Sequence, residues 1–401
     1  MSEMLSVEAA QAALLAAAIP VIESEALPAE SALGRILAAH LVSGVNVPPL
    51  DNSAMDGYAL RLAECAEGQW LPVSQRIAAG HLGQPLQTGT AARIFTGAPI
   101  PEGADCVVMQ EDCESRDGEV RVVRLPKAAA NIRRAGEDIR VGQTVLAPGT
   151  RLGPAQLGVA AAVGETCLTV YRRLKVAVFF TGDEIVPPGQ PLAPGRIYNS
   201  NRATLIALLN QLGVEVIDQG QVADTLDATL AALQRVATAD VVITSGGVSV
   251  GEEDHVKAAV EKIGRIDLWQ VSMKPGKPLA HGVIGKPGGM ADFIGLPGNP
   301  VSAFVVFCLF VRPFLLQRMG AKPHTPASFT LPAGFNRDKP GKRREFMRAR
   351  IELGQAVLYP NQSSGVLTSL AWADGLVDVD AGVTLQAGDP VRFIPFAELL
   401  A

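Results

Sequence analysis

The sequence lacks the patterns that mark disulfide-stapled, zinc-binding, secreted and membrane-spanning proteins. Its five cysteines are scattered, with no C-x-x-C pair and no companion histidine cluster, so neither a disulfide framework nor a zinc site is indicated. The N-terminus carries two glutamates and no basic residue before its apolar stretch, unlike a secretory signal. The longest apolar run, 301–311, is much shorter than the roughly 20 residues that a membrane span needs. We expect a cytoplasmic protein without a membrane segment, in which 301–311 forms a buried helix.

The sequence also lacks an excess of positive charge. With 35 Lys and Arg against 40 Asp and Glu, the formal net charge of -5 offers no general attraction for nucleic acid or for an anionic membrane, so we expect neither as a partner. Any anionic ligand must therefore bind a local patch. Apolar residues are abundant, at 48%, and 401 residues exceed what one core usually serves, so we expect two to four domains.

Three alanine-rich stretches predict helices. Two of them, 6–18 and 31–40, fall in a first segment, 1–44, and are expected to belong to one small unit. The third, 153–163, falls in the segment 147–173. We expect this segment to rejoin the first one as a single discontinuous helical and extended domain.

The remaining segments differ in pattern. From 45 to 146, short β-type runs separated by Gly, Pro and Asp indicate a β-rich domain. From 174 to 321, short unbroken apolar strands alternate with longer helices, which is typical of βαβ units and of a parallel sheet covered on both faces. From 322 to 401, further β-type runs indicate a small β barrel or sandwich, including one at 365–367. The predicted fold class is multi-domain α/β plus β.

The strand exits of the α/β domain carry the most unusual residues. Ligands of an open parallel sheet bind beyond the carboxyl ends of its strands, where turns expose backbone N–H groups. The candidate ligand-binding residues at these exits are Ser245, Gly246, Gly247, Ser249, Gly251, Lys274, Lys277, Pro297, Gly298, Asn299 and Pro300. Each group taken alone also fits a bland alternative: an ordinary glycine-rich turn, a solvated lysine hairpin, or a helix N-cap at Asn299-Pro300.

Three carboxylates, Glu184, Asp224 and Asp254, stand at or after the ends of predicted strands. Mg²⁺ on a phosphorylated ligand takes one or two carboxylates together with phosphate and water, so these residues are a candidate metal site. A solvated surface carboxylate is the alternative for each of them alone. Their convergence on the glycine loops favours the functional interpretation.

Two dense polar loops lie in the β-rich domain, one containing Asp56 and the other Arg133 and Asp138. Arginine forks suit phosphate or similar oxyanions, although an internal salt bridge between Arg and Asp is the commoner explanation for such a mixed cluster. Thr96 either caps a turn or contacts a ligand. The five histidines show no metal-ligand spacing and no nucleophile partner, which argues against serine or cysteine hydrolase chemistry.

Together these segments resemble the molybdopterin molybdenumtransferase family, the bacterial molybdate insertases, whose eukaryotic counterpart is the gephyrin E domain. The resemblance spans nearly the whole chain and rests on several motifs in family order. These are Pro49–Ala59, Arg93–Glu111, Asn131–Asp138, Thr181–Glu184, Ile197–Arg202, Ser245–Asp254, Lys274–Pro278 and Gly295–Ser302. The resemblance implies four domains: a discontinuous helical and extended one, a β-rich one, a three-layer α/β molybdopterin-binding one and a C-terminal β barrel.

The resemblance also implies an activity: insertion of molybdenum from molybdate into adenylylated molybdopterin (adenylyl-molybdopterin), with release of AMP. The residues implied as catalytic are Asp56, Glu184, Asp224, Asp254 and Lys274. The three α/β carboxylates would hold Mg²⁺, and Lys274, Lys277 and Arg133 would hold phosphate or molybdate oxygens. An elongated homodimer is implied, in which Asp56 acts across the interface on the α/β domain of the other subunit.

Two rival functions share part of this resemblance. Molybdopterin adenylyltransferases, which perform the preceding step, resemble the α/β domain but lack the β-rich domain and the barrel. A gephyrin-like scaffold would bind partner peptides without turnover, against which the retained acidic residues argue. The adenylyltransferase and the recipient molybdoenzymes are implied as partners.

The sequence departs from the family at a few positions. Ala135 and Gln270 stand where some members carry arginine and lysine, which implies a less positive anion site here. The barrel is the loosest match, and only a few of its residues resemble the family: Arg343, Glu345, Phe346, Arg348 and the Ser363-Ser364-Gly365 turn.

Overall fold

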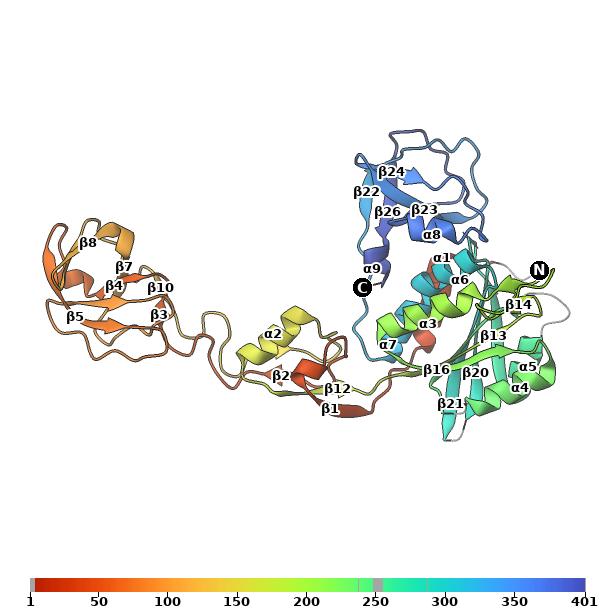
Figure 1. Ribbon diagram of the computed structural model, residues 1–401, viewed down its shortest axis with the longest axis horizontal. Coiled ribbons are helices and arrows are strands. Elements are labelled where there is room, and N and C mark those ends of the chain that lie inside the picture. The colour runs from red at the N-terminus through yellow and green to blue at the C-terminus, as the bar shows by residue number, and fades with distance from the viewer. Residues whose placement is uncertain (1–3, 237, 248–254, 287, 401) are drawn as a thin grey trace.

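The computed structural model describes residues 4–236, 238–247, 255–286 and 288–400. The molecule is elongated, and its parts lie in a row (Figure 1). The β-rich domain forms one end and a small middle unit follows it. The α/β domain forms the other end, with the C-terminal β domain packed beside it.

The α/β domain is built on a six-stranded sheet. Its order is β16 (Glu215–Val222), β13 (Lys175–Thr181), β17 (Val241–Ser245), β21 (Gly289–Leu296), β20 (Pro278–Lys286) and β18 (Gly264–Gln270). The first four strands are parallel, as predicted, but the sheet is mixed because β20 runs antiparallel to both of its neighbours. Neither β20 nor β21 was given a range from the sequence, because glycines interrupt their apolar pattern, although a strand exit was placed at the turn that follows β21.

Helices cover both faces of this sheet, as predicted. On one face lie α1 (Val7–Ala17), α3 (Ser200–Leu212), α6 (Pro300–Val306) and α7 (Arg312–Arg318), and on the other α4 (Leu226–Arg235) and α5 (His255–Ile263). A π-helical turn, η4 (Phe307–Val311), joins α6 to α7. The joined helix, Pro300–Arg318, is apolar and long enough to cross a membrane, yet 83% of its most apolar window is buried in the protein. It is a core helix, as predicted for 301–311.

The middle unit joins two distant parts of the chain. Strand β1 (Ser24–Pro28) pairs antiparallel with β12 (Cys167–Tyr171), and β2 (Leu41–Val42) pairs with β11 (Thr144–Leu146). Helix α2 (Pro154–Ala162) forms where it was predicted. It buries Ala160 in a small core with Leu37 and Val170, so the two parts of the chain share one core.

The N-terminal segment differs from its prediction in two ways. The helix predicted at 31–40 does not form; the chain makes only a short 3-10 turn, η1 (Ala29–Ser31), at the start of this segment. Gly34 then adopts φ +75°, which breaks helical geometry, and Leu37 bridges to Val170 as extended chain. Helix α1 forms as predicted, but it packs on α7, because its apolar face adds to the larger core of the α/β domain.

The β-rich domain contains a second six-stranded sheet. Its order is β7 (Cys106–Met109), β4 (Gly57–Leu60), β6 (Ala91–Ile94), β5 (Trp70–Ile77), β9 (Glu119–Val122) and β8 (Cys113–Arg116). Two 3-10 turns, η2 (Leu62–Glu64) and η3 (Gln110–Asp112), connect its strands. A separate pair, β3 (Asn52–Ser53) and β10 (Ile132–Arg133), brings the two polar loops of this domain side by side.

The C-terminal domain is a small barrel. Its strands run in the order β23 (Arg344–Glu352), β25 (Gly375–Val379), β26 (Pro390–Pro395) and β22 (Phe329–Pro332), with β24 (Gln355–Leu358) on the other edge of β23. A bridge between Ala333 and Ala356 links the two edges. The strand predicted at 365–367 is instead a turn that leads into the short helix α8 (Thr368–Trp372).

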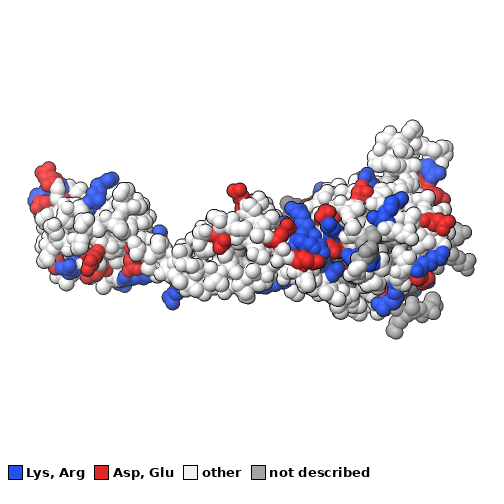
Figure 2. Space-filling view, turned by 90° about the horizontal axis from the view of Figure 1, so that it is seen from below, with Lys and Arg blue, Asp and Glu red and all other residues white. Residues whose placement is uncertain are grey.

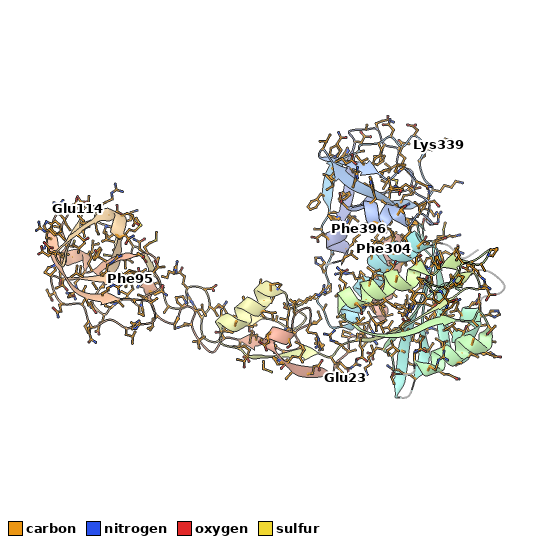
Figure 3. All side chains as sticks on the ribbon, viewed as in Figure 1. Glu23, Phe95, Glu114, Phe304, Lys339 and Phe396 are labelled. Atoms are coloured by element: carbon orange, nitrogen blue, oxygen red, sulfur yellow. The ribbon has the colours of Figure 1, made fainter. Side chains whose placement is uncertain are left out.

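The barrel and the α/β domain are joined at two places. The two-residue strand β19 (Met273–Lys274), which belongs to the α/β domain, pairs with the start of β23. Phe304 of α6 packs edge-to-face on Phe396 of α9 (Phe396–Leu400), with ring centroids 5.3 Å apart (Figure 3). The barrel is therefore held against the carboxyl edge of the α/β sheet.

Candidate functional site

A pocket of about 910 Å³ opens at the carboxyl edge of the α/β sheet. Its walls come from the loops that follow β13, β16, β17 and β21, the four parallel strands, and from the barrel. Of the predicted site residues, the lining includes Glu184, Asp224, Gly246, Gly247, Lys274, Lys277, Pro297, Gly298 and Asn299. The sheet thus gathers groups that lie far apart in the sequence.

The turn after β17 requires its glycines. Gly246 adopts φ +97°, and a Cβ there would lie 2.6 Å from the carbonyl oxygen of Thr181. A Cβ at Gly247 would lie 2.5 Å from Cγ2 of Val256 on α5. Because neither position tolerates a side chain easily, the main chain of this turn faces the pocket uncovered, as close approach to a bulky anion requires.

Asn201, in the first turn of α3, ties the two central loops together. Its Nδ2 donates to Ser245 Oγ at 2.8 Å and to the Gly298 carbonyl at 2.7 Å. Ser245 Oγ in turn donates to the Pro297 carbonyl at 3.1 Å. Ser245, predicted to bind ligand, is buried behind the pocket wall, and the hydroxyl is engaged in holding the loops after β17 and β21 together.

Two carboxylates stand at one side of the pocket. Glu184 follows β13, in a loop closed by the short pair β14 (Ile185–Val186) and β15 (Ile197–Tyr198). Asp224 follows β16, the neighbouring strand at the sheet edge, and is half-buried. Among the described residues, no group of three or more His, Cys, Asp or Glu side chains is placed to hold a metal ion.

Cationic groups stand at the opposite side. Lys274 and Lys277 lie on one turn, and Arg343 precedes β23. Arg343 Nη1 donates to the Met273 carbonyl at 3.0 Å, which ties the lysine turn to the barrel. The Lys274 ammonium lies 3.9 Å from the Glu345 carboxylate, but the lysine side chain is 53% exposed, so this long contact neutralises it only weakly. Along the sheet, the pocket passes from carboxylates through glycine turns to cations.

The barrel supplies part of the pocket wall through Gln362, Ser363 and Ser364. The Val301 N–H at the start of α6 donates to the Ser364 carbonyl at 3.0 Å, which fixes this loop to the α/β domain. Local sequence pattern gave no reason to place these residues at the site. The only signal was the family-like Ser363-Ser364-Gly365 turn.

Thr181 lines the pocket but was not among the predicted site residues; it entered only as the first residue of the Thr181–Glu184 motif. It ends β13, is 4% exposed, and its Oγ1 has no hydrogen-bond partner in the described part of the chain. Buried hydroxyls are normally hydrogen-bonded, so an unpaired one that lines a pocket is a candidate ligand contact. A single threonine at the end of a strand carries no distinct sequence signal.

Several predicted residues lie elsewhere. Ser249, Gly251 and Asp254 lie outside the described residues. Asn299 holds the N-cap position of α6, but its side chain makes no capping hydrogen bond and is exposed at the pocket. Pro300 is the first residue of α6 and does not line the pocket.

Asp56 and Thr96 lie in the β-rich domain, at the other end of the molecule. Figure 3 shows Phe95, the neighbour of Thr96, far from the barrel residue Lys339. Asp56 Oδ1 accepts from the Thr96 N–H at 2.8 Å and from the Thr96 hydroxyl at 2.7 Å. These bonds hold the pKa of Asp56 below its usual value, so this carboxylate is ionised at neutral pH.

The second polar loop of the β-rich domain is also remote from the pocket. Arg134 forms an internal salt bridge to Asp51 at 2.5 Å, which was the alternative interpretation of this cluster. Arg133 and Asp138 are exposed, and neither forms an ion pair within the described ranges. Within one chain, the candidate residues of the β-rich domain therefore do not reach the α/β pocket.

Protein family models match three consecutive parts of the chain. Residues 5–164 match the MoeA N-terminal region (domain I and II), and residues 177–317 match a probable molybdopterin binding domain. Residues 330–396 match the MoeA C-terminal region (domain IV). The matches follow the order of the parts seen in the structure.

Full-length relatives show the same organisation. The molybdopterin molybdenumtransferase of Haemophilus influenzae is 39% identical, with 99% of this chain and 100% of the relative covered. Two solved structures of molybdopterin biosynthesis MoeA proteins from Pyrococcus horikoshii also match. One is 33% identical with a TM-score of 0.77, covering 98% of this chain and 99% of the other; the second is 26% identical with a TM-score of 0.83, covering 98% and 100%. The chain belongs to the molybdopterin molybdenumtransferase family.

Proposed function

We propose that this protein transfers molybdenum from molybdate to adenylylated molybdopterin and releases AMP. The observation that carries the proposal is the α/β pocket, in which carboxylates, glycine turns and cations meet at one sheet edge. The three-part organisation of the molybdenumtransferases accompanies that pocket. An adenylyltransferase confined to the α/β domain would need neither the β-rich domain nor the barrel.

The pocket suits a ligand with a pyrophosphate at its centre. The uncovered main chain at Gly246 and Gly247 offers a surface on which a phosphate can rest closely. Lys274, Lys277 and Arg343 then face the oxygens of molybdate or of the phosphates. As an oxygen of molybdate or of water attacks one phosphorus of the pyrophosphate and bonds to it, the bond between the two phosphates breaks. Negative charge then grows on the departing phosphate, and these cations stabilise it.

The donor set at the acidic side fits Mg²⁺. Mg²⁺ at phosphate sites takes one or two carboxylates and completes its shell with phosphate oxygens and water. Glu184 and Asp224 would supply those carboxylates, without a third protein ligand from the described residues. The bound ion would supply charge neutralisation on the pyrophosphate.

The proposal includes a homodimer that brings Asp56 to the pocket of the other subunit. Large apolar side chains are exposed on the middle unit and on the segments that flank it in the chain: Ile19, Ile22, Leu33, Val42 and Val45. Figure 2 shows few charged side chains over the middle unit on the face it presents, whereas both signs of charge appear at both ends of the molecule. Exposed apolar surface of this kind is typical of protein interfaces.

Turnover tests the proposal directly. The purified protein is incubated with adenylyl-molybdopterin and Mg²⁺, with and without molybdate, and AMP is measured. We expect AMP release that depends on molybdate. No release under either condition would favour the gephyrin-like scaffold, and release without molybdate would contradict the coupling of the two substrates.

A further inference from the structure

Arg348, on β23, is the largest fully buried side chain of the described residues, at 1% exposed. Its Nε donates to Ser369 Oγ at 3.0 Å. Its Nη2 donates to the Ser363 carbonyl at 3.1 Å and to the Asn361 carbonyl at 3.4 Å. Every one of these partners lies in or just after the barrel loop that reaches the pocket.

The loop is bound to the main chain of Arg348 as well. Gln362 Oε1 accepts from the Arg348 N–H, and Gln362 Nε2 donates to the Arg348 carbonyl, both at 2.9 Å. On its other side the loop turns Ser363 and Ser364 toward the pocket, and the Ser364 carbonyl holds the start of α6. One arginine therefore supports, from inside the barrel, a segment that forms the pocket wall.

This burial is costly in electrostatic terms. Arg348 forms no ion pair within the described ranges, and burial lowers the pKa of its guanidinium to about 10. A buried cation without a carboxylate is poor for stability compared with an apolar side chain of similar size. The planar fork of arginine does provide several donors in fixed directions, which suits the loop carbonyls. The presence of an arginine at this buried position is therefore better explained by its hydrogen bonds to the 361–364 loop than by a contribution to stability.

We infer that Arg348 is a positioning residue: it holds the 361–364 loop in the pocket wall that the barrel supplies, and this wall binds the oxyanion together with Arg343 and the lysine turn. Because Ser363, Ser364 and Arg343 all line the pocket from the barrel, displacement of the loop should weaken oxyanion binding first. In the proposed function the adenylylated pterin also contacts the loops after the parallel strands, so its binding should be affected less. This inference rests on the proposed function, in which that oxyanion is molybdate.

The test compares Arg348→Met, Arg348→Lys and Ser369→Ala with the wild type. Arg350→Met is the matched control: Arg350 lies two residues along β23 but contacts Glu352 and the Trp372 ring instead of the loop. Molybdate binding to the full-length protein is measured by calorimetry, and KM is measured for each substrate from AMP release. We expect Arg348→Met to weaken molybdate binding by about tenfold or more, because small displacements of binding groups are costly. Arg348→Lys and Ser369→Ala should have smaller effects, and Arg350→Met should have none.

A folded Arg348→Met protein with wild-type molybdate affinity would overturn the inference, and so would an equal rise in KM for both substrates. If Arg348→Met does not fold, Arg348→Lys and Ser369→Ala decide the question by the same criteria. A wild type that binds molybdate but releases no AMP would contradict the proposed function alone. A wild type that binds no molybdate would overturn this inference.

Discussion

The two ends of the molecule carry candidate functional residues in opposite arrangements. At the α/β end, loops from four strands and a barrel segment close around one pocket, and a buried hydroxyl there still lacks a partner among the described residues. At the β-rich end, Asp56 is ionised and bound to Thr96 beside open surface. The first arrangement can enclose a ligand by itself. The residues of the β-rich domain can contribute to a site only against another protein surface, and we propose that the second subunit provides it.

The largest expected effect comes from removing the Glu184 carboxylate from the α/β pocket. Glu184→Ala should lower AMP release by at least about a hundredfold, because it removes a ligand of the Mg²⁺ that would neutralise the pyrophosphate. Stability should change by less than about 0.5 kcal/mol, since Glu184 is exposed on a loop. Asp183→Ala is the control, because Asp183 is the adjacent exposed carboxylate and does not line the pocket. Equal turnover in the two variants would remove Glu184 from the site.

Mixing two inactive variants tests whether Asp56 of one subunit completes the α/β pocket of the other. Asp56→Ala should lose turnover as Glu184→Ala does. Asp56 precedes β4 and Glu184 follows β13, and these strands belong to the domains at opposite ends of the molecule (Figure 1). If subunits exchange at random in a symmetric dimer, a mixture of the two variants should regain about a quarter of wild-type activity, because half of the dimers then hold one intact site. The measurement is AMP release before and after exchange. A mixture that stays inactive although exchange is confirmed by mass would contradict a shared site.

A smaller effect is expected from closing the space at the glycine turn. In Gly246→Ala the new Cβ would approach the Thr181 carbonyl to 2.6 Å at φ +97°, so we expect a loss of stability of about 1–3 kcal/mol and a higher KM for the pterin. Gly220→Ala is the matched control: Gly220 also has positive φ, +68°, but a Cβ there meets nothing within 4 Å. Chemical denaturation measures the loss of stability in both variants, and the KM for the pterin measures the loss of binding. Their comparison shows whether the contact with the Thr181 carbonyl adds to the cost of backbone strain. Equal effects in both variants would assign the cost to strain.

The contrast between the two ends also explains what the sequence could and could not predict. The α/β pocket was predictable because parallel strands end at the same edge, so Glu184, Asp224 and Lys274 had to converge wherever the alternating pattern held. Glycine caused two errors of opposite kind. Strands β20 and β21 form although glycines interrupt their apolar pattern, whereas the helix expected at 31–40 is broken by Gly34 with its positive φ.

Contacts between domains were beyond local reasoning. Packing of α1 on the α/β domain, and the contribution of Ser363 and Ser364 to the pocket, depend on how separate folding units dock. No period or motif within either segment encodes that docking. The resemblance to the molybdenumtransferases supplied the order of the domains. It did not distinguish Thr181, whose buried hydroxyl has no hydrogen-bond partner among the residues that the structure describes.

The smallest expected effect comes from removing a buried threonine hydroxyl. It distinguishes the contribution of that hydroxyl to protein stability from its contribution to ligand binding. Thr181 and Thr244 both bury an Oγ1 that has no hydrogen-bond partner within the described part of the chain, but only Thr181 lines the pocket. Because a buried polar atom without a partner costs roughly 1–3 kcal/mol, replacement of either by Val should leave the free energy of unfolding unchanged or raise it by about 1 kcal/mol. Only Thr181→Val should also weaken ligand binding, by several-fold, because a net hydrogen bond is worth about 1 kcal/mol. Calorimetric titration with the pterin substrate and denaturant unfolding of both variants would measure this. If Thr181→Val and Thr244→Val bind the pterin equally well, the Thr181 hydroxyl is a packing defect of the strand end, and the pocket recognises its ligand without it.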